Sequence, residues 1–387
     1  MRQFDRHILI EWRATAIDDP VERLRYLRLV TSPTRTIPLS DGARRLWLAG
    51  LAALALGILS GNAGLSNSSR PTVRPLLLPP PVVISRTWQD PSGVWLVDHR
   101  AGAETYSNGL RIDNSFAISN VPRDSYRVFE RDHPDILHSH WKDSPAGIVF
   151  HTTESEQAPF EEGQNGNLQR ISVVTLNHVR RNHSYHFFID RFGRVFRVVN
   201  ESDVAFHAGR SVWGDDAYVY VNLNSAFLGI ALETQVKKDQ PLEAATSAQV
   251  DSLRVLTQML RSRYGIRDSN CVTHAQVSVN SSNMLIGYHT DWADRFPFLE
   301  IGLKDNYLAP PASLSAFGFE YDPSYVQSTG ARLLPALMEA EAGLKASAAR
   351  LHLPLGRYRL VLQKNYKEIT AVASSIDAAK ETTNEQN

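Results

Sequence analysis

The stretch Ala146-Gly-Ile-Val-Phe-His151 is a short apolar run that ends in a histidine. Its length and composition predict a buried strand that delivers His151 to its carboxyl end. Cys271-Val-Thr-His274 has the same pattern, and Asp291 follows it in Gly287-Tyr-His-Thr-Asp291. Two imidazoles and one carboxylate form a common catalytic zinc set, which leaves a fourth position open for water. If these three side chains converge, the sequence predicts a metal-dependent hydrolase.

An α/β domain over residues 144–310, with a mixed central β-sheet flanked by helices, is predicted around these strands. Further strands are expected at 185–190, 194–199, 226–233 and 272–274, and helices at 166–181 and 246–264. The first two of these strands form a hairpin. Thr246 and Gln249 match a capping box at the start of the second helix, and Gly265 is suited to end it.

Two flanking segments are expected on either side of this domain. Residues 84–143 contain turn signals between short alternating runs, which predicts a small β-rich lead-in. Residues 311–387 predict a C-terminal helical extension, with an amphipathic helix at 331–352 and a polar tail. The sequence leaves open whether this helix packs on the domain or contacts a partner.

The N-terminal region is dominated by one long apolar run. It begins at Leu46, follows Arg44 and Arg45, and extends through small residues to 65. This predicts a signal-anchor helix at 46–65, after a cytoplasmic segment at 1–45 with more arginines than acidic residues. A Pro-rich tether at 66–83 would follow. The alternatives are a cleaved signal, with Gly61-Asn-Ala63 as the cleavage site, and a buried globular helix.

Composition and the absence of two sequence motifs narrow the class of protein further. The chain has 387 residues and a formal net charge of zero, so no nucleic-acid partner is indicated. Its single cysteine, Cys271, excludes an intrachain disulfide. The sequence contains neither a Gly-x-Ser-x-Gly elbow nor a His-Glu-x-x-His motif, which argues against serine hydrolases and the commonest metalloproteases.

Residues 146–300 resemble the type 2 N-acetylmuramoyl-L-alanine amidases, a family that includes phage amidase lysozymes and peptidoglycan recognition proteins. Five stretches carry the resemblance in the family's order: Ile148-Val-Phe-His-Thr-Thr153, Tyr185-His-Phe-Phe-Ile-Asp-Arg-Phe-Gly193, Ala205-Phe-His-Ala-Gly209, Asn224-Ser-Ala-Phe-Leu-Gly-Ile230, and Thr273-His274 with His289-Thr-Asp291. The resemblance implies the amidase fold and places Zn²⁺ on His151, His274 and Asp291.

The resemblance also suggests catalytic roles. His289 stands where many relatives carry a lysine, and it is expected to stabilise the oxyanion; it could instead be a solvent-facing residue or compete with Asp291 for the metal. Relatives with a glutamate base place it two residues after the strand glycine, which here is Ala231. Glu233 lies on the same strand face and is the predicted general base, with Glu154 as its rival.

Substrate contacts are expected from residues in the third and fourth stretches. His207 is expected to line the substrate groove near Asn222 and Asn224, and His186 is a further candidate, with core packing as its alternative. His138 and His140 have metal-ligand spacing but precede the domain, and a surface turn is the preferred interpretation.

The function implied by the resemblance is zinc-dependent hydrolysis of the amide between N-acetylmuramic acid and L-alanine, in peptidoglycan or a muropeptide. The alternatives are a peptidoglycan-binding module without catalysis and a zinc peptidase with another amide substrate. The expected location is the bacterial cell envelope, with the catalytic domain on the periplasmic side of the inner membrane, or secreted if the N-terminal segment is cleaved.

The anchor can be tested on the full-length chain. Because an apolar span of this length partitions into the bilayer, we expect the intact chain in the membrane fraction, released by detergent but not by high salt. Immunodetection after fractionation measures this. A freely soluble full-length chain would overturn the anchor.

Overall fold

The computed structural model describes residues 93–235 and 245–384. The predicted cytoplasmic segment, signal-anchor and tether therefore lie outside the described residues. Within the part of the chain that is described, no helix has both the length and the apolarity that a membrane crossing requires.

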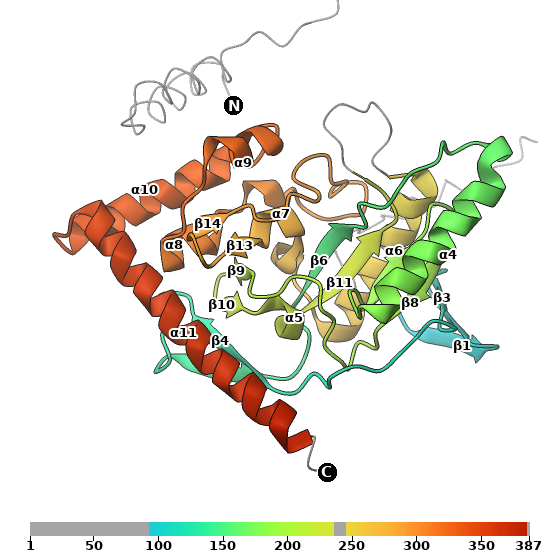
Figure 1. The fold of residues 1–387 in the computed structure, drawn as a ribbon, viewed down its shortest axis with the longest axis horizontal. Coiled ribbons are helices and arrows are strands. Elements are labelled where there is room, and N and C mark those ends of the chain that lie inside the picture. The colour runs from blue at the N-terminus through green and yellow to red at the C-terminus, as the bar shows by residue number, and fades with distance from the viewer. Residues whose placement is uncertain (1–92, 236–244, 385–387) are drawn as a thin grey trace, which may run out of the picture. The chain divides into compact units, whose positions relative to one another are not determined.

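The site is built on an eight-stranded mixed sheet, which is the longest sheet among the described residues (Figure 1). Its strands in spatial order are β1 (Leu96–Arg100), β2 (Ala103–Tyr106), β3 (Arg111–Asp113), β8 (Val195–Arg197), β7 (Phe187–Ile189), β11 (Phe227–Leu232), β6 (Gly147–Thr152) and β12 (Cys271–Thr273). The central strands β7, β11, β6 and β12 are parallel to one another, whereas β7 and β8 form the predicted antiparallel hairpin. This confirms the mixed α/β architecture.

Every residue of β6 and β11 is buried, because both faces of the sheet are covered. Helix α6 (Ser247–Tyr264) packs Leu253 and Leu256 on one face, in the same cluster as Phe150. Helix α4 (Asn165–Arg181) packs Leu176 on the other face, against Phe188. Side chains alternate along a strand, so His151 lies on the face opposite Phe150, which is the α4 side.

The ends of α6 confirm the sequence prediction. Thr246 and Gln249 form a reciprocal capping box, in which each side chain accepts a hydrogen bond from the other residue's backbone. Gly265 ends the helix with a φ of 65°, a left-handed conformation that glycine adopts without steric cost.

A second, four-stranded antiparallel sheet packs beside α4 on the same face of the central sheet. Its strands in order are β5 (Ser139–Lys142), β4 (Tyr126–Glu130), β10 (Tyr218–Val221) and β9 (Val212–Gly214). Val128 and Tyr220 from this sheet pack with Val149 and Val272 of the central one. The segment 84–143 thus supplies strands to both sheets, and β3 joins it to the central sheet by parallel pairing with β8.

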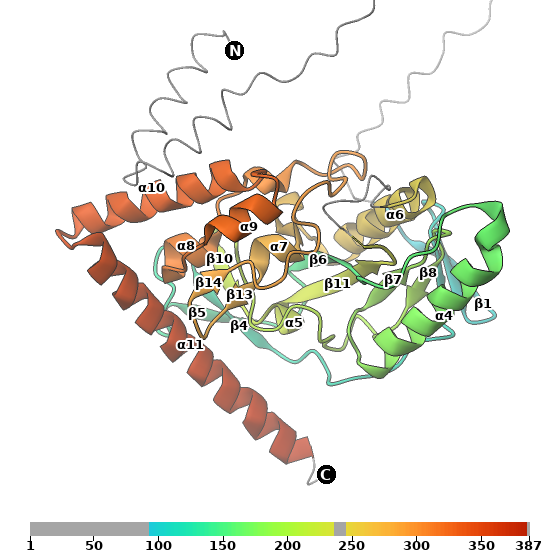
Figure 2. The same cartoon turned by 45° about the horizontal axis from the view of Figure 1, so that its top comes forward.

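The C-terminal helices pack on the domain, which answers the question that the sequence left open. Helices α10 (Leu334–Arg350) and α11 (Leu355–Asn384) form a V at one side of the domain (Figures 1 and 2). Tyr366 of α11 packs against Phe317 and Phe319, and its hydroxyl donates to the carbonyl of Arg210. The remaining elements are η1 (Glu162–Gln164), α5 (Leu223–Ala226), η2 (Asp268–Asn270), α7 (His274–Val277), β13 (Val279–Asn280), β14 (Leu285–Ile286), η3 (Asn306–Leu308), α8 (Ala312–Phe317) and α9 (Pro323–Ser328).

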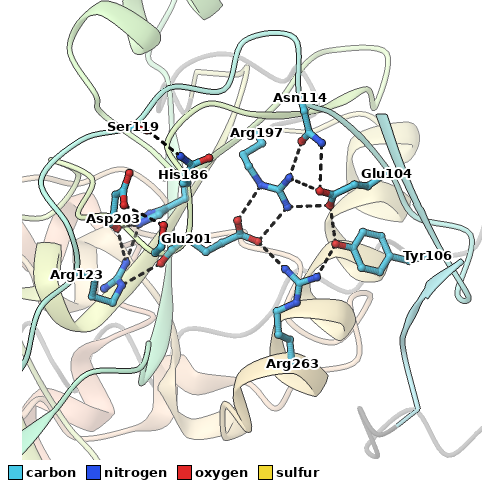
Figure 3. Close-up of polar contacts among 12 residues, drawn as sticks. Glu104, Tyr106, Asn114, Ser119, Arg123, His186, Arg197, Glu201, Asp203 and Arg263 are labelled. Carbon is cyan, nitrogen blue, oxygen red and sulfur yellow. Dashed lines mark hydrogen bonds and ion pairs between the residues drawn. The ribbon is translucent and has the colours of Figure 1, made fainter. Parts of the chain in front are cut away.

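A partly buried network of polar and charged side chains links the first strands to the rest of the domain (Figure 3). Arg197 of β8 donates to Glu104 of β2 at 2.9 Å and pairs with Glu201 at 2.8 Å. Arg263 of α6 pairs with Glu201 at 3.1 Å and donates to the Tyr106 hydroxyl at 2.7 Å. Burial alone would raise the pKa of Glu104, but hydrogen bonds from Arg197 and Tyr106 outweigh it and lower the pKa to about 2.

Replacement of Glu104 by Gln tests the contribution of this network to stability. The variant loses a charge-assisted hydrogen bond in a partly buried site, so we expect a loss of about 1.5–3 kcal/mol in unfolding free energy at pH 7. Because the folded-state pKa is depressed, the stabilisation is complete above the unfolded value of 4.5 and is lost as pH falls toward 2.

Urea unfolding between pH 2 and pH 7 measures the effect. Exposed Glu300 provides the matched control, and Glu300→Gln is expected to change stability by less than about 0.5 kcal/mol. A constant difference between wild type and Glu104→Gln across this pH range would contradict the assignment.

Candidate metal centre

Parallel pairing brings the two histidines together. Thr273 of β12 pairs with Phe150 of β6, so the residues that follow them, His274 and His151, emerge side by side at the carboxyl edge of the sheet. His274 is the first residue of α7, and His151 is the penultimate residue of β6. Both side chains are almost completely buried.

Asp291 completes the group from a loop. Its Oδ1 lies 2.9 Å from Nδ1 of His274, and its Oδ2 lies 3.1 Å from Nδ1 of His151. One ligand atom from each residue lies within 4.8 Å of the other two. Zinc bonds of about 2.0–2.1 Å in a tetrahedron separate neighbouring ligand atoms by about 3.3 Å, so this donor set fits the ion.

The surroundings of these residues favour an ionised Asp291 and a neutral His151. Burial alone would raise the pKa of Asp291, but the charge of His274 and the close polar contacts with His151 and His274 outweigh it and hold the pKa far below its ordinary value. Burial, together with the charge of His274, lowers the pKa of His151 to about 4. A carboxylate and a neutral imidazole are the forms that bind a metal.

The loop that carries Asp291 is held firmly in place. The backbone N–H of Ala275 donates to the Asp291 carbonyl at 3.2 Å. Trp292 is fully buried with a φ of 55°, and its carbonyl accepts from the Tyr307 hydroxyl at 2.7 Å. A left-handed tryptophan persists only where the surrounding structure fixes it, so the position of Asp291 is determined by its neighbours.

His289 lies beside the group, as the sequence predicted. Its ring stacks on that of His274 with centroids 4.6 Å apart. Its backbone N–H donates to Ser278 Oγ at 2.9 Å, and burial and His274 lower the pKa of the ring. The ring is partly exposed, so one of its nitrogens can serve as a hydrogen-bond donor to a molecule at the metal group.

Tyr185 belongs to this site, although the sequence assigned it no role. Its ring lies 5.0 Å from that of His151. Burial raises the pKa of Tyr185, and the charges of Asp291 and Glu154 raise it further, so the hydroxyl keeps its proton at neutral pH. The available signal was its position two residues before β7, within one of the five stretches that carry the resemblance.

The two candidate bases have different surroundings. Glu233 is fully buried, and its Oε2 accepts hydrogen bonds from Ser172 Oγ on α4 and from the backbone N–H of Arg191. Burial raises the pKa of Glu233 to about 7. Glu154 is exposed in the loop after β6; it accepts from Thr152 Oγ1, and its charge acts on Tyr185.

The predicted substrate residues are also placed by the structure. His207 is buried, and its Nδ1 lies 3.1 Å from Nε2 of His151. Asn224 Oδ1 accepts hydrogen bonds from the backbone N–H groups of residues 207, 208 and 209 at 2.8–2.9 Å.

His186 is fully buried and lies among structural partners. Its Nδ1 accepts from the Gly229 N–H at 2.9 Å, and its Nε2 lies 3.1 Å from the Asp203 carbonyl and 2.8 Å from Arg123 (Figure 3). These contacts match the core-packing alternative for His186.

His138 and His140 lie away from this group. His138 pairs with Asp135 at 2.9 Å, and His140 pairs with Glu130 at 3.0 Å, both at the surface. Among the residues that the structure describes, only His151, His274 and Asp291 form a group of metal-ligand geometry.

Comparison with known proteins shows which family part of this chain resembles. Residues 141–291 match the family model described as N-acetylmuramoyl-L-alanine amidase. This segment contains β6, β11 and β12 and ends at Asp291, so it includes all three residues of the metal group. The match covers less than half of the chain and agrees with the resemblance that the sequence motifs indicated.

Several solved structures are similar to parts of this chain. The amidase LysC from Clostridium intestinale URNW is 25% identical, with a TM-score of 0.27, and the match covers 41% of this chain and 83% of LysC. AmiD from E. coli, in complex with an anhydromuropeptide substrate, is 18% identical with a TM-score of 0.34, over 69% of this chain and 96% of AmiD. Drosophila PGRP-LB is 14% identical with a TM-score of 0.26, over 43% and 85%. No curated protein matches the chain.

Proposed function

We propose that this protein is a zinc-dependent N-acetylmuramoyl-L-alanine amidase that hydrolyses the amide between N-acetylmuramic acid and L-alanine in bacterial peptidoglycan or its fragments. The observation that carries the proposal is the convergence of His151, His274 and Asp291 inside the segment that matches the amidase family model. Their two imidazoles and one carboxylate leave a tetrahedral position open for solvent.

A zinc ion held by these three residues would supply a Lewis acid that polarises the scissile carbonyl and lowers the pKa of the attacking water. The ring of His289 stacks on that of His274, and the ring of Tyr185 lies beside that of His151. Each can donate a hydrogen bond to the oxygen on which negative charge develops. A carboxylate base takes the proton of the attacking water and passes it to the leaving amine.

We propose Glu154, rather than Glu233, as this base. Glu154 is exposed in the loop that follows the strand carrying His151, and its charge acts on Tyr185, whose ring lies 5.0 Å from that of His151. Glu233 lies on the face that period-two alternation predicted, but it is fully buried and one of its oxygens accepts two hydrogen bonds. A general base must reach the attacking water, and the exposure of Glu154 favours it over the buried Glu233.

Parallel substitutions separate the two carboxylates. Glu154→Gln removes the proton acceptor and is expected to lower kcat by about 10²–10⁴-fold. Glu233→Gln is expected to retain most of the turnover and to lower stability. The measurements are kcat and KM for muropeptide hydrolysis and the urea unfolding of each variant.

Glu156 provides the matched control for Glu154, because it is an exposed glutamate in the same loop. Glu156→Gln is expected to leave kcat unchanged. Near-normal turnover by Glu154→Gln, together with a large loss of kcat in a folded Glu233→Gln variant, would reverse the assignment.

Zinc dependence and bond specificity are tested together on the full chain. Removal of the metal by a chelator is expected to abolish hydrolysis, because the three ligands cannot polarise a carbonyl themselves, and added Zn²⁺ is expected to restore it. Mass spectrometry of digested muropeptides detects the free stem peptide.

The same assay distinguishes the alternatives. Cosedimentation with purified cell wall without peptide release would support the binding module. Equal cleavage of a peptide that lacks the muramoyl group would support a peptidase with another substrate. Either result would contradict the proposed amidase.

A further inference from the structure

We propose that His207, held in place by Asn224, is a positioning residue that fixes the ring orientation and tautomer of His151, so that the Nδ1 lone pair of His151 points toward Asp291. This inference rests on the proposed zinc site. It gives His207 and Asn224 a role different from the substrate contacts that the sequence predicted.

A chain of hydrogen bonds determines the tautomer of His207. Its Nε2 lies 3.2 Å from the carbonyl oxygen of Phe227, which can only accept a hydrogen bond. The proton of the neutral ring is therefore assigned to Nε2. The Nδ1 of His207 is then an acceptor, and it faces Nε2 of His151 at 3.1 Å.

The tautomer of His207 determines the tautomer of His151. Because Nδ1 of His207 accepts, Nε2 of His151 must donate, and the neutral ring keeps its lone pair on Nδ1. That lone pair lies 3.1 Å from Asp291 Oδ2, which is also an acceptor. Two acceptors at this distance repel each other unless a cation lies between them, and this is the orientation that a metal ligand requires.

The His207 ring fits a closely shaped space. A Cβ atom at Gly229 would lie 2.6 Å from Cγ of His207, so a side chain at position 229 would displace the ring. The ring of His207 also lies 5.8 Å from the ring of His186. The absence of a side chain at Gly229 therefore allows His207 to reach both His151 and the Phe227 carbonyl.

Asn224 fixes the backbone from which His207 projects. Its Oδ1 accepts from three consecutive N–H groups, those of residues 207, 208 and 209. Both ring nitrogens of His207 and this amide oxygen are thus occupied by contacts within the protein. Their arrangement serves to hold His151 rather than to contact a substrate.

The test measures zinc affinity, with a chromophoric chelator as competitor, on the full chain. His207→Phe retains the ring volume but removes both nitrogens, and we expect zinc to bind about 10–100-fold more weakly. His207→Asn places an amide oxygen near the former Nδ1 position, and we expect it to recover most of the affinity. His140→Asn at the surface is the matched control and is expected to bind zinc as the wild type does.

A second pair of variants covers the case in which His207→Phe does not fold. Asn224→Leu removes the acceptor for the three N–H groups at similar volume, and we expect weaker zinc binding. Asn224→Asp keeps an oxygen at the same position, and we expect near-wild-type affinity. Thermal unfolding of the metal-free variants measures the purely structural effect of each substitution.

The outcomes separate this inference from the proposed function. If wild type binds zinc and releases stem peptide, but His207→Phe or Asn224→Leu binds zinc with unchanged affinity, the positioning role is wrong and only packing remains. If wild type binds no zinc, both the metal site and this inference are overturned. If wild type binds zinc without releasing stem peptide, and the Phe and Leu variants bind zinc more weakly, the positioning role stands while the proposed activity fails.

Discussion

The parallel pairing of β6 with β12 is the constraint on which the site depends. Two parallel strands in register end at the same edge of a sheet, so the residues that leave them are neighbours whatever their separation in sequence. The pairing of Thr273 with Phe150 fixes His274 beside His151 in this way. A slip of one residue would turn one imidazole to the opposite face of the sheet, where α6 packs, and the metal group would be lost.

Burial of this edge creates a second requirement, because polar groups beneath His151 must find partners inside the protein. Three imidazoles lie in a row in this buried region: His151 contacts His207, and His207 packs beside His186. The two inner histidines hydrogen-bond to the backbone: His207 to the Phe227 carbonyl, and His186 to the Gly229 N–H. His207 and His186 are therefore held to β11 by hydrogen bonds that do not involve the metal ligands themselves.

Local signals in the sequence predicted much of this fold. The apolar run that ends at His151, the hairpin before and after Gly193, and the cap at Thr246 depend on neighbours within a few residues, and the structure confirms all three. The convergence of His151, His274 and Asp291 followed from the resemblance and from the rule that ligands gather at strand ends.

Contacts between distant segments could not be predicted in the same way. Period-two alternation placed Glu233 on the correct face, but it could not show that Ser172 on a separate helix would bind the carboxylate. The contact between His207 and His151 joins a loop to the end of β6, and no local pattern relates the two. The parallel pairing of β3 with β8 joins the segment before residue 144 to the central sheet. It likewise cannot be predicted from the sequence of either strand alone.

The contact between Tyr366 and the Arg210 carbonyl has a consequence for where this protein can be cut. Arg210 directly follows the three residues that Asn224 secures, so the last helix supports the same loop that carries His207. The family-matched segment also lacks β1, β2 and β3, and Tyr106 of β2 accepts a hydrogen bond from Arg263 of α6. The family-matched segment, which contains the metal group, is thus shorter than the part of the chain that supports it. Excising that segment would leave the loop that carries His207 without its contact to the last helix.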